Sequence, residues 1–140
     1  MTAGRFSLLF LALLILGACS KPSEYSCFVP ASEVEGGPYI FLLDNPDSLN
    51  TYDLSFYTGA GCRFGGDVRL DIMWISPDRQ VFREKVYLQP SETAGSVQLY
   101  RSGIRPGTVG QWVLLVNVIH APKFFPGLGI VSNCTENGTR

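Results

Sequence analysis

Residues Asp67–Ile75 read DVRLDIMWI, and polar and apolar side chains alternate along most of this stretch. The apolar residues that share one face are Val68, Leu70, Ile72 and Trp74. The opposite face carries Asp67, Arg69 and Asp71. A period of two residues is typical of a half-buried strand in an antiparallel sheet. This stretch therefore predicts a β-fold in which one face of the strand packs on the core.

A second stretch, Gln111–Ile119 (QWVLLVNVI), also alternates, but both of its faces are largely apolar. We expect a central strand here, covered on both sides or nearly so. Shorter strand candidates are Tyr39–Leu43, Tyr52–Thr58, Val81–Leu88, Val97–Tyr100 and Leu128–Asn133. Short strands at this spacing favour a sandwich of two sheets.

Turn residues separate the strand candidates. Ser76–Arg79 (SPDR) places proline at the second position of a type I turn between two strand-like runs. Beyond residue 18, no segment shows ten residues of helical periodicity. We therefore predict an all-β fold: a single antiparallel β-sandwich of the jelly-roll or immunoglobulin-like type, with seven to eight strands. The large side chains expected in its core are Trp74, Trp112, Phe41, Phe56, Leu70 and Leu114.

Length and composition narrow the class of protein. The chain has 140 residues, enough for one domain; 46% of them are hydrophobic and 16% charged. This composition is too apolar for a disordered chain. The formal net charge is −1, so the chain lacks the excess of basic residues that binding to phosphate groups needs. We therefore expect no nucleic-acid partner.

The first eighteen residues have the pattern of a secretory signal peptide. Arg5 is their only charge, and the uncharged stretch from Phe6 to Ala18 has 13 residues. A helix that spans a bilayer needs roughly 17 or more. A positive end, a short apolar middle and small residues after it predict a signal peptide over residues 1–18 that is cleaved.

The tetrapeptide Leu16-Gly17-Ala18-Cys19 resembles a bacterial lipobox. The resemblance implies cleavage before Cys19 and acylation of its thiol, so that membrane lipid holds the mature chain. Residues 19–36 are then the lipidated cysteine with a tether or N-terminal extension, and residues 37–140 are the sandwich domain. Ser20 implies sorting to the outer membrane, where we expect a lipid-anchored protein that faces the periplasm.

Three thiols remain after lipidation: Cys27, Cys62 and Cys134. An oxidising compartment favours a disulfide between any two that can meet, and one of the three is left over. We favour Cys27–Cys134, because the first and last strands of sandwiches often lie side by side. Cys62 is the alternative partner.

The sequence offers little material for catalysis or metal binding. Structural zinc sites usually take ligands in close pairs, and the three thiols and His120 are widely spaced. The chain has one histidine and no G-x-S-x-G elbow for a hydrolase. We therefore predict a protein that is not an enzyme, with no catalytic residues, no metal and no cofactor.

Two loops have residues suited to binding. Arg63 and Phe64 lie among glycines, and Phe124 and Phe125 are adjacent in a Lys-Phe-Phe-Pro-Gly segment. Exposed aromatic side chains at loop tips can stack on sugars or anchor a protein partner. The alternative for Phe124 or Phe125 is that it closes the end of the sandwich.

Read end to end, the mature chain resembles the gliding-motility lipoprotein H family of Bacteroidetes. After the lipobox, the resemblance rests on Phe28-Val29-Pro30, Tyr39–Leu43, Tyr52-Asp53-Leu54, the strand that ends at Trp74, Gly110-Gln111-Trp112 and Gly127-Leu128-Gly129-Ile130. The sequence departs from the family in its extra cysteines, and Arg63-Phe64-Gly65-Gly66 stands where the family has an aromatic–Pro–Tyr run. The resemblance implies a non-catalytic adaptor or scaffold in an envelope assembly for gliding motility or secretion, with a protein partner. The alternative is a module on the outer membrane that binds a glycan or another small ligand.

Overall fold

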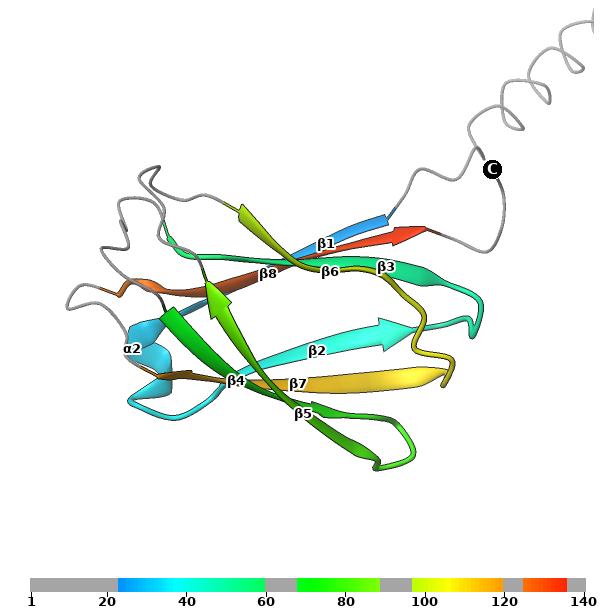
Figure 1. The fold of residues 1–140 in the computed structure, drawn as a ribbon, viewed down its shortest axis with the longest axis horizontal. Coiled ribbons are helices and arrows are strands. Elements are labelled where there is room, and N and C mark those ends of the chain that lie inside the picture. Colours follow the sequence, from blue (N-terminus) through cyan, green and yellow to red (C-terminus); the bar gives the residue numbers. More distant parts are fainter. Residues whose placement is uncertain (1–22, 60–67, 89–96, 120–124, 136–140) are drawn as a thin grey trace, which may run out of the picture.

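A computed structural model of the chain describes residues 23–59, 68–88, 97–119 and 125–135, which form eight strands and one short helix (Figure 1). The elements in chain order are β1 (Ser23–Pro30), α2 (Ala31–Val34), β2 (Tyr39–Asn45), β3 (Thr51–Tyr57), β4 (Val68–Ile75), β5 (Val81–Leu88), β6 (Val97–Ile104), β7 (Gly110–Ile119) and β8 (Gly127–Thr135). Each strand expected from the alternation pattern lies within or overlaps one of these strands.

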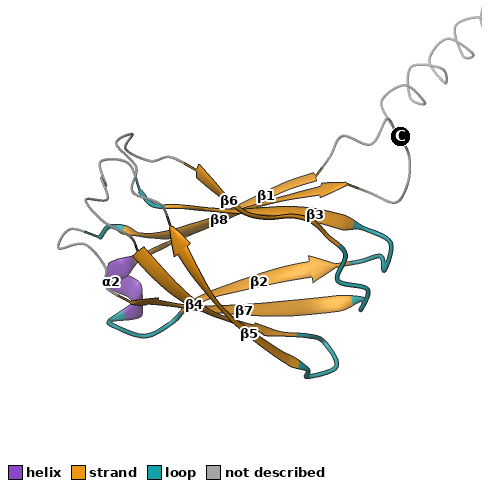
Figure 2. Ribbon diagram, in the orientation of Figure 1, coloured by secondary structure: helices purple, strands orange, loops and turns teal. Residues whose placement is uncertain are grey.

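The strands form two antiparallel sheets of four, as Figure 2 shows. One sheet has the order β1-β8-β3-β6 and the other has the order β2-β7-β4-β5. Among the described strands, β4 and β5 are the only pair that follow one another in the chain and share a sheet. Every other pair of consecutive strands belongs to different sheets. This eight-strand order is that of a jelly roll. The prediction of a single antiparallel β-sandwich is confirmed.

The first strand lies in a segment that the sequence did not assign to the sandwich. β1 pairs with β8 over its whole length, from Ser23 opposite Cys134 to Pro30 opposite Gly127. The expectation that residues 19–36 are only a tether or extension is therefore wrong from residue 23 onward. The strand was missed because only Cys27 and Val29 of its side chains pack against the core, while Tyr25 and Phe28 are exposed.

The two ends of the sandwich differ. The turns β2–β3, β4–β5 and β6–β7 lie at one end, together with the start of β1 and the end of β8; we call this the open end, at the right of Figure 1. The predicted Ser76–Arg79 turn lies here, where the Arg79 N–H donates to the Ser76 carbonyl oxygen at 2.9 Å. The opposite end carries α2, and we call it the α2 end.

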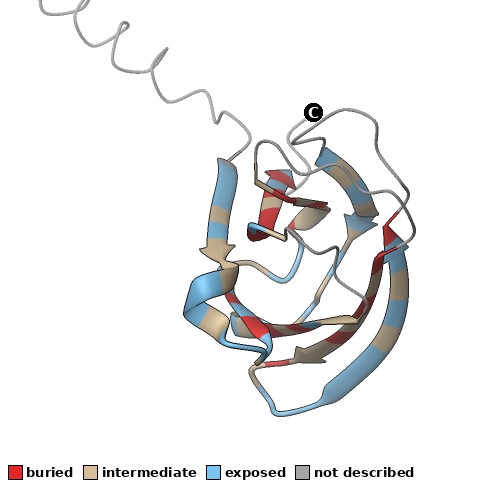
Figure 3. Cartoon of the chain, turned by 90° about the vertical axis from the view of Figure 1, so that its left-hand side faces the viewer, coloured by how far each residue is buried: buried red, intermediate tan, exposed pale blue. Residues whose placement is uncertain are grey.

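The hydrophobic core lies in the middle of the sandwich, and Figure 3 marks the buried residues in red along the strands. Phe41, Phe56 and Leu114 are at most 1% exposed, as the sequence predicted. Trp74 and Trp112 do not belong to this fully buried set. Both face inward but are only half-buried, because they stand at the open end of their strands.

An irregularity between β3 and β6 sets which β6 side chains face inward. Tyr52 pairs with Ile104 and Leu54 with Arg101, so β6 has one extra residue in this interval. Gly103 absorbs that residue with a φ of +67°, a conformation that favours glycine. The Asp53 carboxylate accepts hydrogen bonds from the Gly103 N–H at 2.7 Å and the Ser102 hydroxyl at 2.8 Å. These bonds lower the pKa of Asp53.

Candidate functional site

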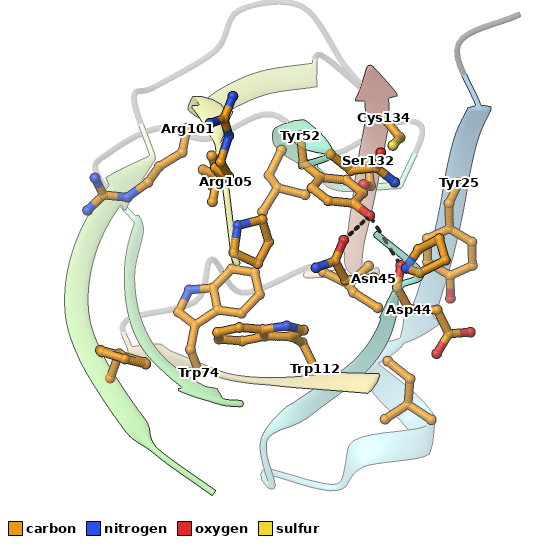
Figure 4. A pocket seen from close by; sticks show the side chains of 18 of the residues that line it. Tyr25, Asp44, Asn45, Tyr52, Trp74, Arg101, Arg105, Trp112, Ser132 and Cys134 are labelled. Carbon is orange, nitrogen blue, oxygen red and sulfur yellow. Dashed lines mark hydrogen bonds between the residues drawn. The ribbon is translucent and has the colours of Figure 1, made fainter. Parts of the chain in front are cut away.

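A pocket of about 620 Å³ lies between the two sheets at the open end (Figure 4). All eight strands or the turns beside them contribute to its walls. The lining residues are Tyr25, Leu42, Leu43, Asp44, Asn45, Pro46, Asn50, Tyr52, Leu54, Trp74, Phe82, Glu84, Arg101, Ile104, Arg105, Pro106, Trp112, Ser132 and Cys134. We call this site the end pocket.

Both tryptophans of the chain line the end pocket. Trp74 stands near the end of β4 and Trp112 near the start of β7, two neighbouring strands of one sheet. Their ring centroids are 6.2 Å apart with an angle of 77° between the planes, so that the two rings form a corner. Phe82 lies nearly parallel to Trp112 at 6.5 Å. Three aromatic rings therefore wall the pocket from the β2-β7-β4-β5 sheet.

Polar contacts join the sheets on the β5–β6 side of the pocket. The Trp74 indole N–H donates to the Tyr100 hydroxyl oxygen at 3.2 Å. The Arg101 guanidinium forms an ion pair with the Glu84 carboxylate, and its Nε–H donates to Glu84 Oε1 at 3.3 Å. This pairing raises the pKa of Arg101. Arg101 lies between the two register shifts in the pairing of β3 with β6, at Tyr52/Leu54 and at Leu54/Ser55.

A second set of hydrogen bonds joins the sheets on the β2–β3 side. The Tyr52 hydroxyl donates to Asn45 Oδ1 at 2.8 Å, as the dashed lines of Figure 4 show. The buried Asn45 in turn donates from Nδ2 to the Thr108 carbonyl oxygen at 2.9 Å. Burial raises the pKa of Tyr52 to about 12. The phenol is therefore neutral at physiological pH and acts as a hydrogen-bonding group.

The end pocket can enclose a ligand, and its walls show no grouping of metal-binding residues. Among the residues that the structure describes, there is no cluster of three or more His, Cys, Asp or Glu side chains that could hold a metal ion. No described helix is long and apolar enough to cross a membrane.

The binding loops expected from the sequence do not form this site. Arg63, Phe64 and Phe124 lie outside the described residues. Phe125 is half-buried and packs edge-on against the buried Tyr39 with ring centroids 6.2 Å apart. Phe125 therefore closes the α2 end of the sandwich, which is the alternative that the sequence left open, and is not an exposed binding residue.

The favoured disulfide is not formed. β1 and β8 do lie side by side, but Cys27 pairs with Ile130 and Cys134 pairs with Ser23. The two cysteines are therefore four residues out of register, about 13 Å along the strands. A disulfide needs Cα atoms roughly 4.4–6.8 Å apart, and both thiols are free in the structure. Cys62, the alternative partner, and Cys19, the predicted lipidation site, lie outside the described residues.

Sequence reasoning missed the end pocket because it treated both tryptophans as core residues. The signal that it could have used is that each stands beside a turn: Trp74 is two residues before Ser76, and Trp112 is two after Gly110. Nothing in the sequence marked Asn45 and Tyr52 as pocket residues, because their hydrogen bond forms only where β2 and β3 meet in the folded chain.

A second surface stands out on the outer face of the β2-β7-β4-β5 sheet. Ile40 and Val81 are 52% and 50% exposed on its two edge strands. Leu115 lies opposite Ile40 and Met73 lies opposite Leu115, and both are half-buried. Arg83 lies opposite Met73 on β5, so Val81 is two residues along β5 from this line. We call these four residues the outer apolar row; it runs across the sheet with no described element over it.

Comparison with known proteins gives the chain no family. No protein-family model matches the chain, and no curated protein matches it in sequence. A crystal structure of a protein from Sulfurospirillum deleyianum is similar with a TM-score of 0.49 and 9% identity, over 84% of this chain and 100% of that one. Structures of infectious bursal disease virus, strains Gx and Gt, have TM-scores of 0.39 and 0.37 at 11% and 12% identity, over 86% of this chain and 32% of each viral chain. Likenesses at this level carry no statement about ligand or function.

Proposed function

We propose that this protein is a non-catalytic binding module of the cell envelope that holds a small ligand in the end pocket. The observation that carries the proposal is the pocket itself. Its volume of about 620 Å³ falls in the range of roughly 300–1,000 Å³ that ligand sites occupy, and most of its lining residues are aromatic or apolar, with polar and charged residues among the rest. A site of this form favours a small ligand, the alternative in the sequence analysis, over an adaptor role.

The two tryptophans give a direct test of ligand binding. Because Trp74 and Trp112 are the only tryptophans and both line the pocket, all tryptophan emission reports on the site. We expect a saturable emission change when the full chain, held in lipid nanodiscs, is titrated with a panel of fatty acids, aromatic acids and oligosaccharides. Leu99→Ala, at a 64% exposed position of β6, is the matched control and should leave the titration unchanged. A flat titration with every class of compound, in chains whose pocket mass spectrometry shows to hold no lipid or acyl group, would contradict the proposal.

The envelope location rests on the lipobox resemblance and remains part of the proposal. An acyl anchor at Cys19 would keep the sandwich at the outer membrane, facing the periplasm, without a spanning helix. Palmitate labelling of cells should mark the wild-type chain and fail to mark Cys19→Ala. A mature amino terminus at any residue other than 19 would refute the anchor and leave the ligand proposal standing.

A second candidate function is the envelope adaptor, with a role in gliding motility or secretion. The outer apolar row favours it, since contiguous exposed apolar surface often marks a protein interface. Ile40→Lys should abolish crosslinking to an envelope protein, while Lys85→Gln, also on the outer face, should not. Unchanged crosslinking in Ile40→Lys would remove the support for this candidate.

A further inference from the structure

The aromatic walls of the end pocket offer ring faces and not hydrogen-bond donors. The Trp74 indole N–H is bonded to the Tyr100 hydroxyl at 3.2 Å, and the Trp112 indole N–H is bonded to the Thr108 carbonyl oxygen at 3.1 Å. Phe82 has no polar atom in its side chain. A sugar needs many hydrogen-bond partners, and these three rings supply none.

The polar groups of the inner walls are largely occupied by the protein. Asn45 uses its carbonyl oxygen for Tyr52 and its amide for Thr108. Ser132 and Cys134 add one hydroxyl and one thiol from β8, and both residues are buried. The Tyr52 hydroxyl is likewise occupied by its bond to Asn45, and burial raises its pKa. The interior therefore suits an uncharged, apolar group.

The charged groups of the pocket stand at its mouth. Arg101 and Glu84 neutralise each other in their ion pair. Arg105 on the β6 side and Asp44 on the β2 side are exposed, and neither side chain forms an ion pair with another described residue. Figure 4 shows the two arginines on one side of the tryptophans and Asp44 on the other. A polar head group can stay at this rim while an apolar group lies inside.

The mouth lies at the end of the sandwich where β1 begins. Ser23 pairs with Cys134, which lines the pocket, and Tyr25 lines it too. Cys19 precedes Ser23 by four residues, a reach of at most about 14 Å in extended chain. An anchor at Cys19 would therefore turn the mouth toward the membrane surface.

We infer that the end pocket receives the hydrocarbon chain of an amphiphile, with the head group held at the charged rim. The inference rests on the proposed ligand-binding function and names its ligand class. The same hydrocarbon can come from two sources: a free lipid of the membrane, or an acyl group on the chain's own Cys19.

Photocrosslinking in cells tests this inference on the full chain. Phe82 is replaced by photoreactive benzoylphenylalanine, which inserts into nearby C–H bonds; the ring at this position is half-exposed, so the larger side chain can be accommodated. The same replacement at Trp112 is a second pocket probe, and at Leu99 it is the control on an exposed outer position. Mass spectrometry then identifies what is joined to each position.

We expect a mass gain equal to a lipid or fatty acid at positions 82 and 112, and no such gain at position 99. A mass gain equal to a free lipid identifies the membrane as the source, whereas a crosslink to the acylated N-terminal peptide identifies Cys19; either supports the inference. A glycan or peptide adduct at 82 and 112 would overturn the hydrocarbon ligand and leave the pocket's binding function intact. If neither position yields an adduct in chains that remain folded in cells, both the inference and the proposed function fail.

Discussion

The middle of the sandwich and its open end are built by the same strands, yet they differ in how deeply the inward-facing side chains are buried. On β4, Leu70 and Ile72 are at most 2% exposed, whereas Trp74, the next inward residue, is only half-buried. On β7, Leu114 is fully buried and Trp112 is not. The alternation continues without a break, but the opposite sheet no longer fills the space. Position along a strand therefore separates residues that stabilise the fold from residues that can meet a ligand.

The largest effect should come from the middle of the sandwich. Phe56→Ala removes a fully buried ring and should reduce the free energy of unfolding by about 3–5 kcal/mol, because it leaves a cavity in close-packed surroundings. Equilibrium unfolding in urea measures this loss of stability. Tyr87→Ala, at a 57% exposed position, is the control and should stay within about 0.5 kcal/mol of wild type. Similar losses in both variants would erase the distinction between core and surface.

At the open end, removal of a larger ring should cost less stability. Trp112→Ala should reduce the free energy of unfolding by about 1–2 kcal/mol, since a half-buried side chain gains only part of the burial energy. Its effect on the emission titration should be much larger than that of Trp112→Phe, which keeps a ring in place. A stability loss equal to that of Phe56→Ala would show that the open end is an ordinary part of the core.

The hydrogen bond between Tyr52 of β3 and Asn45 of β2 should contribute still less to the free energy of unfolding. Tyr52→Phe should cost about 1 kcal/mol at neutral pH, because it removes the bond to the buried Asn45. Burial raises the pKa of Tyr52 from 10.0 to about 12, so the neutral phenol favours the folded state. That contribution is complete below pH 10 and is lost as the pH rises toward about 12.

Chemical unfolding of the wild type and of Tyr52→Phe between pH 9 and 12 measures this contribution. The wild type should lose stability more steeply than the variant over the upper part of this range. Tyr25 and Tyr39 also have raised pKa values through burial, so a smaller slope should persist in Tyr52→Phe. Identical slopes would mean that ionisation of Tyr52 is not linked to folding.

The smallest effect should come from the ion pair at the rim. Glu84→Gln should cost less than about 1 kcal/mol, because Arg101 is largely exposed and solvent screens the pair. Thermal melts at low and high salt should converge for wild type and variant as salt rises. Lys85→Gln, which changes a charge on the outer face, is the control. A loss of several kcal/mol would show that the pair holds the two sheets together.

The sequence predicted the strands well because alternation is a local property. In a strand such as DVRLDIMWI, the alternation itself identifies the apolar face that points inward. A sheet of several such strands can bury its apolar face only against a second sheet. β1 was missed because its eight residues mix polar and apolar side chains, and only Cys27 and Val29 among them pack against the core. The disulfide failed for a related reason: adjacency of the first and last strands was foreseen, but the register between Cys27 and Cys134 was not.

The sequence by itself determined an all-strand sandwich and which side chains of its main strands face inward, because both follow from a repeat of two residues along a single strand. Only the tertiary structure decided that Trp74 and Trp112 wall a pocket and that Phe125 closes the other end. Those outcomes depend on where one sheet stops covering the other, and on contacts such as Glu84–Arg101 that join residues from different strands. No pattern within a single strand carries that information.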